Sequence, residues 1–191
     1  MMERSVKFLS LSGLSGILSG LYALTGSLGV YLIIYYPFSP FGFRIRYIDE
    51  NQVLLYLILI AVAVLILSLS TGYFLSLRKA KKLNVSIWNS ASQQMFIDLF
   101  IPLASGGLLI IIMVIQGHYS IVAPACLVFY GLALVQASRS TYEEVKYLGL
   151  TEIVLGLGCA IFPGYGLIIW AIGFGVMHVI YGTLMHYRYD R

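Results

Sequence analysis

The chain has 191 residues, of which 60% are hydrophobic and only 10% are charged, and its formal net charge is +4. A soluble domain has roughly 45–50% apolar and 25% charged residues, so a water-soluble globule of this composition would expose large apolar patches. The composition therefore excludes a soluble globular domain and predicts an integral membrane protein.

Six apolar runs are expected to be transmembrane helices, and they lie near residues 6–35, 53–77, 95–115, 120–138, 145–162 and 165–186. In lipid, only helices and closed barrels satisfy every backbone group, and runs such as residues 54–67 lack the alternation of barrel strands. Six spans of about 20 residues use roughly 120 positions. We therefore predict one all-α transmembrane domain, residues 1–191.

The first run is bounded by Pro37 and Pro40 and carries small residues four apart, at Ser12, Gly16 and Gly20. This spacing favours a face on which another helix approaches closely. That helix belongs either to the same chain or to a second copy. The last run is a second candidate for tight packing because of its own glycines, Gly166, Gly173, Gly175 and Gly182.

The middle of the chain contains the next boundaries. Basic residues at 78–82 are expected to end the second run, and the short connections 116–119 and 163–164 to join tightly packed antiparallel helices. Pro102 lies inside the third run and is followed by Ser105, Gly106 and Gly107, which predicts a kink or local unwinding. The fifth run is the least typical span, because it is short and contains charged residues.

The twelve Lys and Arg residues indicate which way the spans face. With six spans and a cytoplasmic N-terminus, only Arg44 and Arg46 fall on the outer side, which leaves ten on the cytoplasmic side. This distribution obeys the positive-inside rule, and without the fifth span Arg188 and Arg191 would change sides. We expect both termini in the cytoplasm. The positive charge is then explained by topology and attraction to anionic lipid, not by nucleic acid.

Two pairs of segments suggest an internal repeat. VKFLSLS at 6–12 resembles VKYLGLT at 145–151, and TGYFLSLR at 71–78 resembles YGTLMHYR at 181–188. The similarity predicts three repeated helical hairpins, formed by the first and second, third and fourth, and fifth and sixth runs, around a central cavity. The alternative is that apolar helices share few residue types and end in basic residues for topological reasons.

Away from the ends of the apolar runs, three side chains are acidic, basic or imidazole groups: Asp98, Glu152 and His178. Such residues cost at least ~2.5 kcal/mol near the membrane centre on insertion scales and often mark functional sites. Counted along the helices, all three fall in the cytoplasmic half, where Gln136 and Ser12 add polar groups. The pattern predicts a polar pocket open to the cytoplasm, in which the carboxyls hold a cation or proton and His178 relays or senses protonation.

Each of these residues also has a structural interpretation. Asp98 would cap or lie at the mouth of the third helix, Glu152 would pair with Arg139 or Lys146, and His178 would bond a neighbouring carbonyl. The sequence contains no complete catalytic motif, nucleotide-binding motif or metal-ligand spacing. We therefore assign no catalytic residue, metal or other cofactor.

The chain resembles a family of small bacterial polytopic inner-membrane proteins that has no assigned activity. The resemblance lies in SLSGLSGILSG at 10–20, FYGLALVQASRST at 129–141, EVKYLGLTEIVLG at 144–156 and WAIGFGVMHVIYG at 170–182. It covers most of the chain. It implies a six-helix, multi-pass protein of the bacterial inner membrane, and it implies no substrate, cofactor or catalytic residue.

Three classes of function remain. The first is a transporter-like or small-ligand- or lipid-binding bundle, whose pocket reaches past Glu152. The second is a membrane sensor or accessory subunit with a solid core, which acts through helix contacts with a partner. The third is an intramembrane enzyme that uses Asp98, Glu152 and His178 as acid and base. The expected partners are membrane lipids and either a second copy or another membrane protein, and nucleic acid is not among them.

Overall fold

The structure is a computed structural model that describes residues 13–34, 50–84, 86 and 88–190. All regular structure in these ranges is helical, which confirms the all-α prediction. The long helices are α2 (Gly13–Ile34), α3 (Glu50–Leu83), α4 (Ser90–Ile115), α5 (Val122–Ala137) and α6 (Glu143–Ile161). A further long helix, here called the last helix, consists of α7 (Gly166–Trp170), a π-helical segment (Ala171–Met177), α8 (His178–Met185) and a π-helical end (His186–Asp190).

Five helices in the described residues are long and apolar enough to cross a membrane: Gly13–Ile33, Gln52–Lys82, Ser90–Ile115, Tyr119–Ser140 and Gly166–Tyr189. These are features of an integral membrane protein, as the composition predicts. Helix α6 is not among the five, although it has 19 residues. Its charged residues lower its hydropathy, and three of them lie in its first four positions, at Glu143, Glu144 and Lys146.

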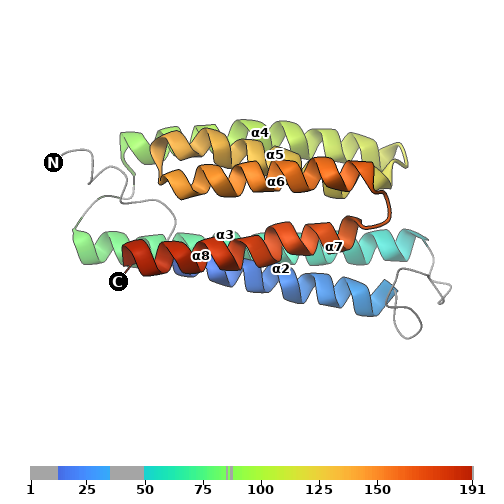
Figure 1. Ribbon diagram of the computed structural model, residues 1–191, viewed down its shortest axis with the longest axis horizontal. Helices are drawn as coiled ribbons and strands as arrows, with labels where there is room; N and C mark the ends of the chain where they lie inside the picture. The colour runs from blue at the N-terminus through green and yellow to red at the C-terminus, as the bar shows by residue number, and fades with distance from the viewer. Residues whose placement is uncertain (1–12, 35–49, 85, 87, 191) are drawn as a thin grey trace.

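The helices form two layers (Figure 1). One layer contains α4, α5 and α6, with α5 in contact with both neighbours. The other contains α3, α2 and the last helix, with α2 in contact with both neighbours. The short connection after α6 therefore passes from one layer to the other, and α6 packs more extensively on α5 than on the last helix.

Glycines allow α5 and α6 to touch through their backbones. A Cβ atom on Gly131 would lie 2.5 Å from the carbonyl oxygen of Gly149, and one on Gly149 would lie 2.7 Å from that of Gly131. Real Cβ atoms do not approach carbonyl oxygens this closely. The contact between these two helices therefore requires that both positions lack a side chain.

The small-residue face of the first span lies against the last helix of the same chain. A Cβ atom on Gly20 would lie 2.7 Å from the carbonyl oxygen of Gly175, and one on Gly16 would lie 3.1 Å from the Cα atom of Gly182. Ser12, the third member of the predicted face, lies outside the described residues. Two members of each small-residue set, Gly16 and Gly20 on one side and Gly175 and Gly182 on the other, thus face each other within one chain.

Two features predicted in the middle of the chain have different outcomes. The basic residues 78–82 lie in the last turns of α3, which ends directly after them at Leu83. Helix α4 runs without interruption from Ser90 to Ile115, so Pro102 causes no unwinding. A break in regular α-helix instead lies inside the last helix, at the π-helical segment Ala171–Met177.

One end of the bundle gathers positive charge, and we call it the basic end. It contains the C-terminal end of α3, the connection between α5 and α6 with the first turn of α6, and the C-terminal end of the last helix (Figure 1). These segments hold all seven Lys and Arg of the described residues: Arg78, Lys79, Lys81, Lys82, Arg139, Lys146 and Arg188.

Candidate functional site

A carboxyl group lies in the centre of the bundle. Glu152 is the tenth of the 19 residues of α6 and is 0% exposed, and it is one of the two largest side chains that are fully buried; the other is Leu127 of α5. A Cβ atom on Gly173 would collide with the Glu152 carboxylate and would lie 2.6 Å from Cδ2 of Leu127. The missing side chain at Gly173 therefore provides the space that the carboxylate occupies.

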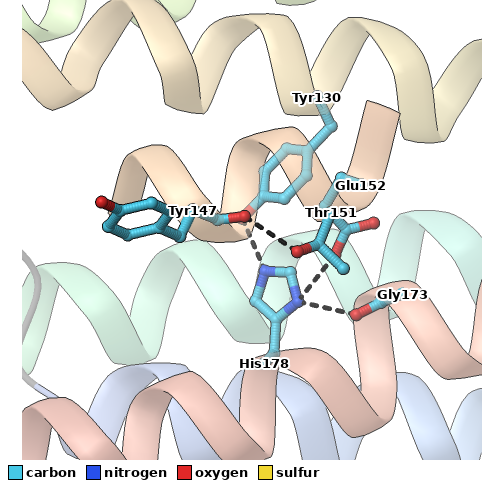
Figure 2. Close-up of polar contacts among 6 residues, drawn as sticks. All are labelled: Tyr130, Tyr147, Thr151, Glu152, Gly173 and His178. Atoms are coloured by element: carbon cyan, nitrogen blue, oxygen red, sulfur yellow. Dashed lines mark hydrogen bonds and ion pairs between the residues drawn. The ribbon is translucent and has the colours of Figure 1, made fainter. Parts of the chain in front are cut away.

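His178 faces this carboxyl from the last helix (Figure 2). Its Nδ1 lies 3.5 Å from Oε1 of Glu152 and 3.0 Å from the carbonyl oxygen of Gly173, and its Nε2 lies 2.7 Å from the hydroxyl of Tyr130. A carbonyl oxygen can only accept, so in the neutral ring Nδ1 carries the hydrogen and Nε2 accepts from the Tyr130 hydroxyl. Both ring nitrogens of His178 thus have hydrogen-bond partners.

The π-helical segment positions the imidazole. It ends at Met177, directly before His178. The side-chain Nδ1 of His178 bonds the carbonyl oxygen of Gly173, which lies within the segment. Such π-helical turns inside α-helices are frequent at functional sites. Phe174, within the segment, packs against the Tyr130 ring at a centroid distance of 4.9 Å and holds that ring beside His178.

Among the described residues, neither carboxylate oxygen of Glu152 has a hydrogen-bond donor, and the only possible ion-pair partner is His178, whose Nδ1 lies 3.5 Å from Oε1. The ion pair with Lys146 or Arg139 that the structural interpretation predicts is not formed, and both of these side chains are exposed. An uncompensated buried charge costs several kcal/mol. A negative charge at Glu152 therefore needs a nearby positive charge, or the carboxyl holds a proton.

Asp98 belongs to a second, separate cluster. It lies in α4, is 6% exposed, and accepts hydrogen bonds from Nε2 of Gln94 at 2.9 Å and from Nε2 of Gln136 in α5 at 3.4 Å. Asn89 caps this helix, so Asp98 does not. In the described part of the chain, no hydrogen bond or ion pair joins Asp98 or Gln136 to Glu152 or His178.

A hollow of about 450 Å³ lies at the basic end, between the start of α6 and the end of the last helix. Its lining includes Glu144, Tyr147, Tyr181, Leu184, Arg188 and Tyr189. Glu152 does not line it and lies eight residues, about two helical turns, from Glu144. This hollow therefore does not match the predicted pocket, which is expected to reach past Glu152; the carboxyl lies buried beyond the hollow.

Tyr130 and Gly173 complete the site and are missed by the sequence analysis as site residues. The first signal is a tyrosine in the middle of an apolar run, because a buried tyrosine hydroxyl usually has a partner. The second is the pair Gly173 and Gly175 shortly before His178, because small residues beside an intramembrane histidine leave room for another polar side chain.

Comparison of the chain with protein-family models, with curated proteins and with solved structures found no match. The resemblance to a family of bacterial inner-membrane proteins stays a prediction. The function has to be inferred from the geometry of the site.

Proposed function

We propose that the chain is a transporter-like or small-ligand-binding membrane protein in which Glu152 and His178 hold one exchangeable cation, in the simplest case a proton. The observation that carries this proposal is the carboxyl of Glu152, which is 0% exposed and lies 3.5 Å from Nδ1 of His178. The two residues come from different helix layers, so the cation would lie between them.

Charge balance supports this assignment. If Glu152 is neutral, it holds a proton; if it is ionised, either His178 is protonated or another cation is present. The hydrogen bonds of His178 with Gly173 and Tyr130 favour a proton over a metal ion, because a metal ion needs a free nitrogen lone pair. Each favourable state of the pair thus contains one cation.

The pair has two states that hold one proton between the two side chains and have the same net charge. In one state, His178 carries a hydrogen on both ring nitrogens and Glu152 is ionised; in the other, Glu152 holds the proton and the neutral ring keeps its hydrogen on Nδ1, bonded to the Gly173 carbonyl. Nε2 donates to the Tyr130 hydroxyl in the first state and accepts from it in the second. The pair is neutral overall in both states.

We also propose six spans, with α6 as the fifth, both termini on the cytoplasmic side, and a location in the bacterial inner membrane. The seven described basic residues at one end of the bundle support this orientation. Helix α6 runs beside α5 for most of its length (Figure 1), and its three other charged residues lie at the basic end. Glu152 would then be the one charged residue of α6 that lies inside the membrane.

A membrane sensor or accessory subunit is the second candidate, and helix α3 favours it. None of the most apolar window of Gln52–Lys82 is buried, and its neighbour in the described bundle is α2. Large side chains such as Leu65, Leu69 and Phe74 are more than half exposed. This face would lie against lipid, against a second copy or against another membrane protein.

Proton movement across vesicles tests the proposal. Purified protein is reconstituted into vesicles that contain a pH-sensitive dye, and the decay of an imposed pH difference is recorded. We expect wild type to accelerate the decay over protein-free vesicles and Glu152→Gln to remove the acceleration.

Asp98→Asn is the matched control, because it removes a buried carboxyl from the other cluster, and it should keep the wild-type rate. No acceleration by wild type would contradict transport and favour the sensor.

A further inference from the structure

An ion pair closes the basic end between α6 and the last helix. Nη1 of Arg188 donates to Oε1 of Glu144 at 2.6 Å, and the hydroxyl of Tyr189 donates to the same oxygen at 2.8 Å. Glu144 is only 8% exposed, whereas the side chain of Arg188 is 65% exposed. The second oxygen of Glu144, Oε2, has no donor among the described residues. Oε2 is itself covered by protein atoms, so a donor from another molecule would reach it from the adjoining hollow, which Glu144 lines, after a rotation of the carboxylate, whereas the guanidinium of Arg188 is exposed.

The hollow of about 450 Å³ lies beside this ion pair, and a second, apolar hollow adjoins it. The second hollow is a shallow groove of about 760 Å³ whose lining includes Val179, Thr183 and Tyr187. Both hollows share the side chains of Ile180, Leu184 and Arg188. A charged chamber and an apolar groove therefore meet along one face of α8.

We infer that this surface binds a phospholipid with a primary ammonium headgroup, of the phosphatidylethanolamine class. The headgroup carries a cation and an anion, and it would lie antiparallel to the ion pair, with its ammonium beside Glu144 and its phosphate beside Arg188. An acyl chain would follow the apolar groove past Leu184. The ends of membrane-spanning helices lie at the depth of the headgroups, which is where this hollow is.

Charge complementarity distinguishes this headgroup from its relatives. A choline headgroup has no N–H group to donate to Oε2 of Glu144, and a glycerol headgroup has no cation to place beside that carboxylate. Glu143 adds a second acidic side chain to the lining of the chamber. The inference is independent of the proposed function, because Glu152 does not line either hollow.

Lipid retention by the purified, detergent-solubilised full chain tests the inference. Native mass spectrometry measures how much phosphatidylethanolamine, phosphatidylcholine and phosphatidylglycerol with identical acyl chains stays bound. We expect phosphatidylethanolamine to be retained preferentially. Glu144→Gln should weaken its retention about tenfold, the effect of losing one charge-assisted hydrogen bond. Glutamine can still accept from Arg188 and Tyr189, so the helix ends should stay together.

Three further variants keep the test decisive. Leu184→Trp fills the groove without touching the ion pair and should reduce retention as Glu144→Gln does, since Leu184 is 46% exposed. Arg188→Gln should weaken retention, whereas Arg139→Gln, which removes an exposed basic residue outside both hollows at the same end, should not. Equal retention of the three lipids, or unchanged preference in both Glu144→Gln and Leu184→Trp, would overturn the inference. Equal binding of water-soluble glycerophosphoethanolamine would also overturn it, because the acyl chain would then contribute nothing.

Discussion

Glu152 is a charged residue type in a position where the surrounding packing suits an apolar side chain. It is buried as completely as Leu127, and its carboxylate lies beside Gly173, where a side chain would collide with it. The polar group that approaches it, the imidazole of His178, is fixed from both sides by Gly173 and Tyr130. At the scale of single residues, the site is therefore one carboxyl and one oriented histidine.

Gly173→Ala tests whether the carboxylate depends on the space at this glycine. The new methyl group would collide with Glu152 and Leu127, so we expect a loss of about 1–3 kcal/mol in stability, the usual cost of overpacking. Thermal unfolding in detergent measures the loss.

Gly158→Ala is the control for this variant. It is also a glycine-to-alanine change in a helix, but its Cβ atom would have no neighbour within 4 Å. We expect it to be neutral or to stabilise by about 0.5–1 kcal/mol through helix propensity. Equal melting temperatures of Gly173→Ala and Gly158→Ala would contradict the packing described for Glu152.

Part of the site could be predicted from single residues. Glu152 and His178 stand out because ionisable residues are rare in apolar runs. The residues that these two side chains contact could not be predicted from single residues. Distance along a helix shows how deep a residue lies but not which helix it faces, and the π-helical segment changes the face of every residue after it. The first reason applies to Asp98 and Tyr130, which lie on other helices, and the second applies to His178.

At the scale of elements, the apolar runs predict the helices well, because length and hydropathy decide which segments are buried in lipid. Irregularities were placed less well. Pro102 removes one backbone donor but leaves α4 continuous, and Ser105 donates to the carbonyls of Ile101 and Pro102 at 2.9 and 3.1 Å within that turn. The π-helical segment contains no proline, so a search for prolines inside apolar runs does not find it. The three-hairpin repeat stays a prediction.

Helix α6 decides the topology, and cysteine labelling tests whether it crosses the membrane. In a variant that lacks Cys126 and Cys159, single cysteines are placed at Ser120, Ser140, Tyr165 and Asp190. If α6 is a span, a membrane-impermeant maleimide added to intact cells should label positions 120 and 165 and should not label 140 and 190. Labelling of 140 and 165 from the same side would show that α6 does not cross.

At the scale of the whole molecule, the two helix layers meet around a polar pair. Backbone contacts through glycines hold each layer together, at Gly131 with Gly149 and at Gly20 with Gly175. Between the layers, Glu152 and His178 face each other across the boundary. A change in protonation at this pair therefore acts on the contact between the layers. The central claim is that this pair holds one exchangeable cation.

The most direct test is the melting temperature of wild type, Glu152→Gln and Asp98→Asn in one detergent, measured from about pH 5 to about pH 8, the range in which histidine charge changes. If protons bind to the pair differently in the folded and unfolded states, stability depends on pH. We expect the difference in melting temperature between wild type and Glu152→Gln to change across this range, whereas Asp98→Asn should parallel wild type. A constant difference between wild type and Glu152→Gln at every pH would contradict the central claim.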